Sequence, residues 1–379
     1  MSGGPHCAVV GAGIMGAAAA YALARRGARV TLFEQFPFGH DRGSSHGATR
    51  LFRTAYFEHP DYVPLLKRAA MLWRELEEEA HETLFEMTGV FMAGRADSGL
   101  IAGTSLAAEQ HGLHLHRLSR AEARKRFFWF ALDDDMEAMI EPDAGFVYAD
   151  RARAAYLKAA SAHDAELHEN SPVSGWTAKG GQIELEAGGE RHCFDRLVLA
   201  PGAFAGEFVK LGRKFLQPLR KSLFWTSPGE DRFTLANGFL PYAIEEADGR
   251  FRYGFPAVDA DGVKIGEHTG GAPVADPLDQ APDAAAEARR DMEAFLKRRI
   301  PGVSSTIIKE QSCLYAMSPD GHFIIDRHPE SEHVVLAMGH SGHGFKFAPL
   351  IGEALADLAL KGETMREFDF LKLARFDQA

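Results

Sequence analysis

The sequence predicts an α/β fold, in which a mainly antiparallel β region is inserted into a parallel sheet flanked by helices. Residues 7–33 predict a strand, a small-residue helix and a second strand, which form a βαβ unit. Leu197–Ala200 is an uninterrupted apolar run that ends at Pro201-Gly202, as expected for a strand buried on both faces of the same sheet. Between residues 216 and 313 the pattern changes to short alternating runs, which favour a separate antiparallel layer.

Composition and charge exclude several classes of protein. The 379 residues are 46% hydrophobic and 25% charged, which fits a globular protein and excludes a disordered or collagen-like chain. Lys and Arg number 42 against 53 Asp and Glu, and this net charge of −11 is a poor match to nucleic acid. Three cysteines do not make a secreted disulfide framework, so we expect a cytoplasmic protein of two or three domains.

One apolar stretch, from Cys7 to Ala24, is long enough to suggest a membrane span. Glycine and alanine supply most of it, and no cationic segment precedes it. We therefore expect this stretch to be buried inside the fold and predict no membrane association.

Periodicity and helix-breaking residues predict the remaining elements in order. The first part of the chain is expected to contain strand Cys7–Val10, helix Met15–Arg26, strand Arg29–Phe33, helix Pro60–His81 and helix Asp150–His163. Strands are then expected at Ile183–Glu186, Cys193–Phe194, Leu223–Thr226, Phe251–Phe255 and Val263–His268. The last part is expected to contain loop Gly270–Asp283, helix Ala284–Arg299, strand Val334–Met338 and helix Ala348–Leu360.

A glycine-rich loop between the first strand and the first helix carries the first functional signal. The next strand ends in an acidic residue about 20 positions on, as the dinucleotide-binding fingerprint requires. The candidate residues are Gly11, Gly13, Ile14, Met15, Gly16 and Glu34. The glycines let a pyrophosphate approach the helix amides, and the glutamate can accept hydrogen bonds from a ribose. The loop predicts dinucleotide binding and leaves FAD and NAD both open.

Three further segments carry a more specific resemblance. They are GSSHGATRLFR at 43–53, YGFP at 253–256 with GVKIGEH at 262–268, and SCLY at 312–315 with HFIID at 322–326 and GHGFKF at 342–347. Together they resemble the monomeric sarcosine oxidase and N-methyltryptophan oxidase family of FAD-dependent amine oxidases. The resemblance implies a glutathione-reductase-type FAD domain at 1–85, 145–215 and 320–379, with a substrate domain at 86–144 and 216–319.

The same resemblance implies a set of flavin contacts beyond the glycine-rich loop and the acidic residue. These positions are Ser44, His46, Thr49, Arg50, Val173, Ala200, Gly202, Cys313, Gly342, Gly344 and Lys346. In the family a cysteine thioether holds the 8α carbon of the flavin, and Cys313 occupies that position.

Substrate-side residues also follow from the resemblance. Arg53 and Lys346 are expected to bind a substrate carboxylate, a task suited to paired cations. Lys264 is expected beside the flavin, where its charge would assist reoxidation by O2. The side chains expected to line the substrate cavity are Tyr253, His268 and Tyr315.

Taken singly, these residue types allow plainer interpretations. Cys313 alone would be a buried structural cysteine, and Lys264 alone would face solvent from a strand. Arg50 and Arg53 would each be surface cations. Lys346 differs, because its phenylalanine neighbours favour burial and a buried ammonium group needs a partner.

Histidines near the third segment do not predict a metal site. His340 and His343, with His322 and Asp326 upstream, have neither zinc-signature spacing nor the helical two-histidine spacing. The nearby glycines are better explained by close approach of the backbone to a flavin.

The other two cysteines, Cys7 and Cys193, fall on predicted strands, and we expect both in the core. Ser45 and Ala48 depart from the family, which tends to have His and Asp at these positions. This departure concerns the surroundings of the flavin and the identity of the substrate rather than the fold.

The expected activity is oxidation by O2 of an N-methyl amino acid, such as sarcosine or N-methyltryptophan, to the amino acid, formaldehyde and hydrogen peroxide, in a monomer. A cyclic imino acid (proline or pipecolate) or a primary amino acid would be a different substrate for the same fold. The sequence also leaves open an NAD-dependent dehydrogenase and a non-catalytic flavin-binding module. Bound flavin, and its reduction by amines, would distinguish these possibilities.

Overall fold

Six strands form the first sheet of the protein, in a computed structural model that describes residues 4–208, 215–227, 231–279 and 286–376. Their order is β20-β21-β13-β1-β2-β9, and every neighbouring pair is parallel except β20 with β21. The strands are β1 (His6–Val10), β2 (Arg29–Phe33), β9 (Glu166–His168), β13 (Arg196–Leu199), β20 (Ile324–His328) and β21 (Ser331–Met338). As the apolar run at 197–200 predicts, β13 lies in this sheet beside β1.

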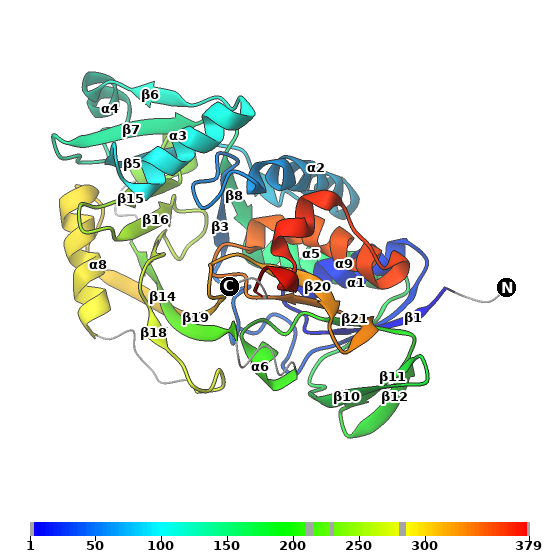
Figure 1. Cartoon of the computed structure of the whole chain (residues 1–379). Coiled ribbons are helices and arrows are strands. Elements are labelled where there is room, and N and C mark those ends of the chain that lie inside the picture. Colours follow the sequence, from blue (N-terminus) through cyan, green and yellow to red (C-terminus); the bar gives the residue numbers. More distant parts are fainter. Residues whose placement is uncertain (1–3, 209–214, 228–230, 280–285, 377–379) are drawn as a thin grey trace.

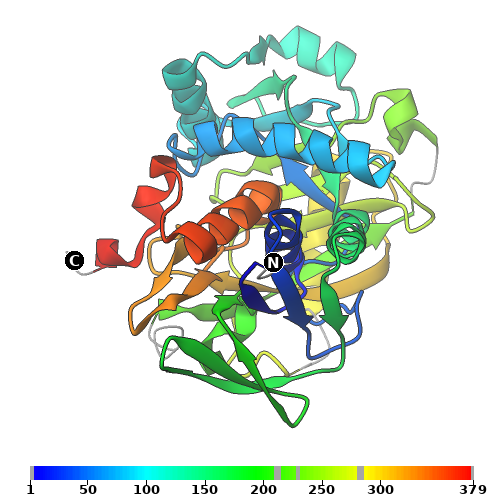
Figure 2. The same cartoon turned by 90° about the vertical axis from the view of Figure 1, so that its right-hand side faces the viewer.

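Both faces of this sheet are covered, which explains its unbroken apolar strands. In β1, Cys7 and Val9 belong to the core under the helices, whereas Ala8 and Val10 face a small antiparallel meander. Figures 1 and 2 show the helices on one side of the sheet and the meander on the other. The helices are α1 (Ile14–Arg25), α2 (Tyr62–Ala80), α5 (Ala149–Ala162) and α9 (Ala348–Lys361), and the meander is β10 (Val173–Lys179), β11 (Gln182–Ala187) and β12 (Glu190–Phe194).

Small residues let α1 lie between α5 and α9. All residues of α1 from Ile14 to Ala24 are buried, so its alanines make contacts on every side. A Cβ added to Gly352 of α9 would lie 2.7 Å from the backbone of Ala18, a spacing that only glycine permits. The stretch 7–24 is therefore buried between protein layers as expected, and none of the described helices is long and apolar enough to cross a membrane.

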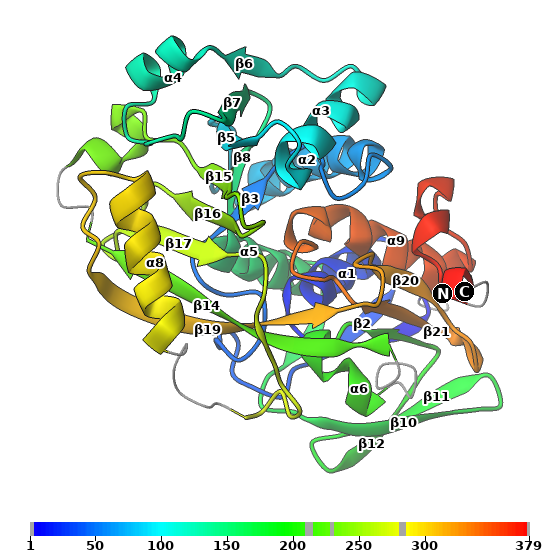
Figure 3. The ribbon, with the colours of Figure 1, turned by 60° about the vertical axis from the view of Figure 1, so that its left-hand side comes forward.

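A second, nine-stranded sheet is mainly antiparallel. Its order is β18-β14-β17-β16-β15-β5-β7-β6, with β19 also paired to β14, and only β15 and β5 run parallel. The strands are β5 (Val90–Arg95), β6 (His116–Leu118), β7 (Met136–Glu141), β14 (Gln217–Thr226), β15 (Tyr242–Glu245), β16 (Phe251–Phe255), β17 (Val263–Glu267), β18 (Ala272–Pro273) and β19 (Ile307–Met317). Helix α8 (Ala286–Arg299) covers one face, where Phe295 and Leu296 pack with Phe224 and Ile265 (Figure 3).

A three-stranded sheet, β3-β8-β4, contains residues 49–52 of the 43–53 segment. It comprises β3 (Thr49–Phe52), β4 (Phe85–Glu86) and β8 (Gly145–Tyr148). Among the described residues, the other elements are α3 (Gly99–His111), α4 (Arg120–Arg126), α6 (Ala205–Phe208) and 3₁₀ turns at Gly202–Phe204, Asp231–Phe233, Leu235–Asn237, Phe345–Phe347, Arg366–Leu371 and Leu373–Phe376. The domain boundaries stay a prediction.

The expected strands and helices are present, several of them longer than the apolar run that predicted them. The strands β12, β14 and β21 each begin before their predicted apolar run, because polar residues ahead of the run also pair with the neighbouring strand. Residues 280–283 of the expected loop and 284–285 of the expected helix lie outside the described residues. One prediction is wrong: Cys193 is exposed, since it alternates with buried Phe194 along β12, whereas Cys7 is buried as expected.

Candidate functional site

The turn between β1 and α1 is shaped by its glycines. Gly11 has a φ of +98°, and a Cβ there would lie 2.5 Å from the carbonyl oxygen of Ala200. A Cβ on Gly16 would lie 1.8 Å from the carbonyl oxygen of Gly11, so α1 can pack against its own loop only with glycine here. The loop can therefore turn tightly and stay close to the start of α1, as phosphate binding by a helix N-terminus requires.

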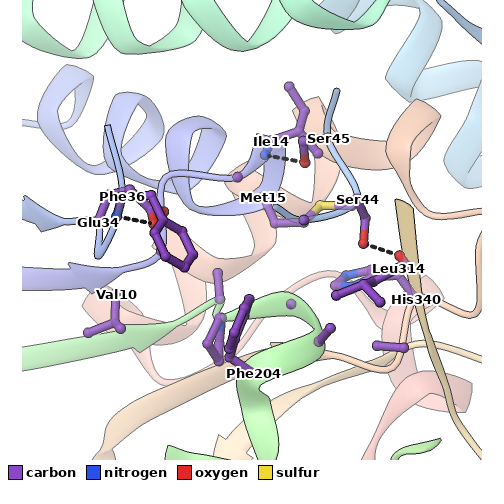
Figure 4. A pocket seen from close by; sticks show the side chains of 18 of the residues that line it. Val10, Ile14, Met15, Glu34, Phe36, Ser44, Ser45, Phe204, Leu314 and His340 are labelled. Carbon is purple, nitrogen blue, oxygen red and sulfur yellow. Dashed lines mark hydrogen bonds between the residues drawn. The ribbon is translucent and has the colours of Figure 1, made fainter. Parts of the chain in front are cut away.

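Glu34, just after β2, is held as an acceptor. Its Oε2 accepts a hydrogen bond from the amide of Ala12 at 2.8 Å, and its Oε1 accepts one from the amide of Phe36 at 3.1 Å (Figure 4). Burial alone would raise the pKa of this carboxyl, but hydrogen bonds with His40 and the Ala12 amide hold it below its ordinary value. An ionised carboxylate at this edge suits a ribose hydroxyl.

One pocket collects residues from the glycine-rich loop, the ends of β2 and β13, the segment before β3, strand β19 and the loop before α9 (Figure 4). The predicted site residues that line it are Gly11, Gly13, Ile14, Met15, Glu34, Ser44, Arg50, Val173, Ala200, Gly202, Tyr315, Gly342 and Gly344. The predicted residues outside its lining are Gly16, His46, Thr49, Arg53, Tyr253, Lys264, His268, Cys313 and Lys346.

Lys264 of β17 is buried, so the interpretation as a solvent-facing lysine is wrong. Its Nζ donates to the carbonyl oxygens of Gly47 at 2.5 Å and Thr49 at 2.7 Å, because the segment before β3 covers this face of the second sheet. Burial, and then the nearby Arg50, hold the pKa of Lys264 well below its ordinary value. Arg50 itself donates to three carbonyl oxygens of the same segment, those of Ser44, His46 and Thr49.

Cys313 lies on β19 opposite Lys221 of β14, in an apolar cluster with Leu223 and Trp225. Its thiol is buried, and burial raises its pKa, although the charges of Arg50, Lys264 and Lys221 act in the opposite direction. The next residue, Leu314, lines the pocket, and its carbonyl oxygen accepts a hydrogen bond from Ser44 (Figure 4). Cys313 is therefore next in sequence to a residue of the pocket wall, and the charges of three basic side chains act on its thiol.

Tyr253, Tyr315 and His268 form one polar group. The Tyr315 hydroxyl is 3.5 Å from Nδ1 of His268 and also interacts with Tyr253. Burial lowers the pKa of His268 to about 3, so its imidazole is neutral. The Tyr315 ring fills the space that a side chain at Gly342 would need, since a Cβ there would lie 2.1 Å from that ring.

Arg53, at the end of β3, is buried with unused hydrogen-bond donors. Its Nη2 is 3.3 Å from Oε1 of Glu58, and its guanidinium lies 4.6 Å from the Phe57 ring centroid. Nε and Nη1 have no hydrogen-bond partner among the described residues. A buried guanidinium with free donors is costly unless a ligand satisfies them, so this group is suited to an anion.

Lys346, in the 3₁₀ turn before α9, is the second buried cation. Its Nζ donates to the Tyr56 hydroxyl and to the carbonyl oxygen of His343, both at 3.1 Å. Burial lowers its pKa to about 7; Glu58 acts to raise it and Arg53 to lower it. The same Glu58 pairs with Arg53, so one carboxylate acts electrostatically on both cations.

Several residues that the sequence analysis did not single out belong to the site. Tyr56 and Glu58 directly continue the 43–53 segment, and that continuity was the available signal. Phe36 and Phe204 line the pocket with ring centroids 6.0 Å apart, near Glu34, where a flat base could pack. Buried Arg153 of α5 also lines it, and no local motif marks that residue.

Ser45 and Ala48, the two residues that differ from the family pattern, each make a backbone hydrogen-bond contact. The Ser45 hydroxyl accepts a hydrogen bond from the amide of Ile14 at 3.0 Å (Figure 4). Ala48 has a φ of +64°, which is unusual for a residue with a side chain, and its amide donates to the Asp150 carboxylate of α5 at 2.8 Å. An acidic group therefore reaches this segment from a helix.

These features fit FAD. The glycine-rich turn suits a pyrophosphate, the Glu34 carboxylate a ribose, and the aromatic pair a base. Both ring nitrogens of buried His46, and Nε2 of half-buried His340 in the pocket lining, lack hydrogen-bond partners among the described residues. Across the parts of the chain that are described, no group of three or more His, Cys, Asp or Glu side chains is placed to bind a metal.

Comparison with known proteins agrees with this site. The model of a family described as FAD dependent oxidoreductase matches residues 6–358. The chain belongs to this family and is an FAD-dependent oxidoreductase, so the NAD-dependent dehydrogenase and the non-catalytic module that the sequence left open are excluded.

Relatives with curated names match along nearly the whole chain. It is 38% identical over 365 residues to monomeric sarcosine oxidase of Streptomyces avermitilis, covering 94% of each chain. It is 34% identical over 371 residues to monomeric sarcosine oxidase of Bacillus sp. (strain B-0618), covering 97% of this chain and 95% of that one. It is 34% identical over 373 residues to N-methyl-L-tryptophan oxidase of Salmonella arizonae, covering 98% of each.

Solved structures confirm the fold. NikD, an amino acid oxidase of nikkomycin biosynthesis, superposes with a TM-score of 0.87 at 22% identity and 98% coverage of both chains. L-proline dehydrogenase from P. horikoshii gives 0.83 at 23% identity, covering 100% of this chain and 99% of that one. The predicted α/β fold with a mainly antiparallel second sheet is confirmed.

Proposed function

We propose that the protein oxidises N-methyl amino acids with O2 and releases the amino acid, formaldehyde and hydrogen peroxide. The observation that carries the proposal is the pair of buried cations, Arg53 and Lys346: Arg53 is paired with Glu58 and keeps free donors, and the charge of Glu58 also acts on Lys346. A small amino acid supplies the anion that the free donors of Arg53 require. Relatives named for sarcosine and for N-methyl-L-tryptophan support an N-methyl substrate.

The chain's own residues would bind and orient this substrate. The substrate carboxylate would accept hydrogen bonds from Nε and Nη1 of Arg53 and from Nζ of Lys346. Neutral His268 and the Tyr315 hydroxyl offer polar contacts to an amine without adding a positive charge that would repel it. Bound flavin would supply the two-electron oxidation of the C–N bond, and O2 would take up the electrons.

Lys264 would act on the O2 half of the reaction. Its Nζ is held against the backbone carbonyl oxygens of Gly47 and Thr49, so that in its protonated form it would place one positive charge near Arg50 and Cys313 at the flavin end of the site. A positive charge held in an apolar environment favours negative charge that develops on reacting oxygen. The expected roles of His46 and Thr49 as flavin neighbours are part of the same proposal.

We also propose that Cys313 carries the flavin through a thioether. Its buried place beside the pocket wall supports this, as do the three cations around it. Acid precipitation should leave the yellow colour in the protein pellet, and peptide mapping should find the flavin mass on the Cys313 peptide. Cys313→Ser should release flavin into the supernatant, whereas Cys7→Ser, on a buried strand of the other sheet, should not. Flavin released from the unaltered protein would contradict the attachment.

The activity is tested by peroxide release from the holoprotein on a panel of sarcosine, N-methyl-L-tryptophan, proline, pipecolate and glycine. Greatest kcat/KM for an N-methyl compound supports the proposal. Greatest kcat/KM for proline or pipecolate, or for glycine, would replace it with a cyclic imino acid or a primary amino acid as substrate. We further propose a cytoplasmic monomer, and sedimentation of the purified protein tests the oligomeric state.

A further inference from the structure

Tyr56 lies between the two cations of the site. It is fully buried in the turn between β3 and α2. The guanidinium carbon of Arg53 is 5.4 Å from the centroid of its ring, and Nζ of Lys346 is 4.7 Å from the same centroid. One aromatic ring therefore contacts both cations, and an aromatic face stabilises a cation most when water is excluded.

The Tyr56 hydroxyl is fixed in direction by a short chain of hydrogen bonds. Nε2 of His343 is 2.9 Å from the carbonyl oxygen of Gly321, which can only accept, so Nε2 carries the proton. Nδ1 of His343 is then an acceptor, and the Tyr56 hydroxyl donates to it at 2.7 Å. When its proton is donated to Nδ1 of His343 rather than to Glu58, the other side-chain acceptor for this hydroxyl, the hydroxyl presents its lone pairs to Nζ of Lys346 at 3.1 Å.

These hydrogen bonds determine how many N–H donors of Lys346 remain for a ligand. An ammonium group has three donors, and Tyr56 and the carbonyl oxygen of His343 accept two of them. One N–H remains, together with Nε and Nη1 of Arg53. The backbone between Arg53 and Tyr56 is also fixed, because Oε1 of buried Glu141 accepts from the amides of Thr54 and Ala55 at 2.6 and 2.7 Å.

We propose that Tyr56 is a positioning residue that holds Arg53 and Lys346 at one spacing and leaves a single Lys346 N–H directed at the substrate carboxylate. The inference rests on the proposed function of these two cations. His343 acts through Tyr56, since its tautomer sets the direction of the hydroxyl proton. Nothing in the sequence motifs marks Tyr56 for this role, which follows from contacts between β3 and the loop before α9.

The test compares Tyr56→Phe with Tyr62→Phe in the flavin-containing protein. Tyr62 is a matched control: it is equally buried and its ring centroid is 5.3 Å from that of Tyr56, but its hydroxyl pairs with His322 and the Phe323 amide. The probe is acetate, which has a carboxylate but no amine, and binding is followed by the flavin absorption spectrum. We expect Tyr56→Phe to weaken acetate binding about tenfold, as for loss of a charge-assisted hydrogen bond, and Tyr62→Phe to change it less than about twofold.

A double-mutant cycle with Lys346→Met separates positioning from general loss of structure. If Tyr56 acts through Lys346, then Tyr56→Phe has no further effect on acetate binding once Lys346 is Met. Equal losses in both backgrounds, or equal affinities of Tyr56→Phe and the unaltered protein, would overturn the inference. Acetate binding that behaves as expected in a protein that oxidises no N-methyl amino acid would instead overturn the proposed function alone.

Discussion

The two ends of the flavin site are built in different ways. The glycine-rich end consists of backbone from one short stretch, and its selectivity depends on side chains that are absent at Gly11 and Gly16. The other end, where we propose that the substrate carboxylate binds, consists of the buried cations Arg53 and Lys346, which come from positions nearly 300 residues apart in the sequence. Backbone amides bind an anion without a charge to neutralise, whereas buried cations bind one because they lack a full set of partners. The first end should therefore be sensitive to added volume and the second to lost charge.

Added volume at the glycine-rich end is expected to have the largest effect. A Cβ at Gly16 would overlap the carbonyl oxygen of Gly11, so Gly16→Ala must displace α1 or the loop, at a cost of about 1–3 kcal/mol or more. We expect loss of nearly all bound flavin and a lower Tm, measured by flavin absorbance per chain and by thermal unfolding. Gly175→Ala is the control, since nothing lies within 4 Å of a Cβ there. Full flavin content in Gly16→Ala would contradict the close packing.

Lost charge at the carboxylate end should spare the flavin and abolish turnover. Arg53→Met removes the free donors and leaves Glu58 unpaired, so kcat/KM for the best N-methyl substrate should fall about 100- to 1000-fold. Steady-state kinetics and flavin content are the measurements. Arg117→Met, which removes an exposed guanidinium paired with Glu137, should keep kcat/KM within about twofold. Equal loss in both variants would indicate that Arg53 does not bind substrate.

The next largest effect is expected in the pH dependence of acetate binding, which should depend on the charge of Lys346. The Lys346 pKa is about 7, lowered first by burial, so the ammonium is charged below that pH and acetate affinity is greatest there. As pH rises through 7 the charge is lost, and the Kd for acetate should rise by up to about tenfold per unit. His268, with a pKa of about 3, stays neutral throughout.

Lys346→Met is the control for that titration. Of the carboxylates beside Lys346, Glu58 and Glu141 act to raise its pKa; Glu141, whose own pKa burial raises to about 6, also titrates near this range. Because Lys346→Met retains Glu141, any slope left in the variant belongs to other groups. A slope equal to that of the unaltered protein would show that Lys346 does not hold the carboxylate.

The smallest effect concerns the cysteines. Cys193 is exposed, whereas Cys7 and Cys313 are buried. A thiol reagent should label the folded protein on Cys193 alone, without loss of activity, and Cys193→Ser should abolish the labelling. Denaturation should then expose Cys7, and Cys313 only in protein without attached flavin. Labelling of Cys313 in the folded holoprotein would contradict both its burial and its attachment.

Prediction from sequence succeeded where the physical cause is local. The turn at Gly11 and the helix from Ile14 depend on neighbours within a few positions, so the pattern contains the information. The prediction that Cys193 lies in the core was wrong, and so was the plainer interpretation of Lys264 as a surface residue. Alternation shows which residues of a strand share a face. Whether that face is buried or exposed depends on which other layer of the fold covers it. The 47–49 segment that covers Lys264 is over 200 residues away in the sequence.

The sequence by itself determined the α/β fold, the dinucleotide loop and the family, because periodicity, glycine spacing and motif residues are properties of short stretches. Only the tertiary structure decided which charges meet. It brought Arg53, Tyr56 and Glu58 together with His343 and Lys346, and it left donors of Arg53 without partners. The energy of a buried charge depends on every group packed around it, and that set is defined only once the layers of the fold have been assembled.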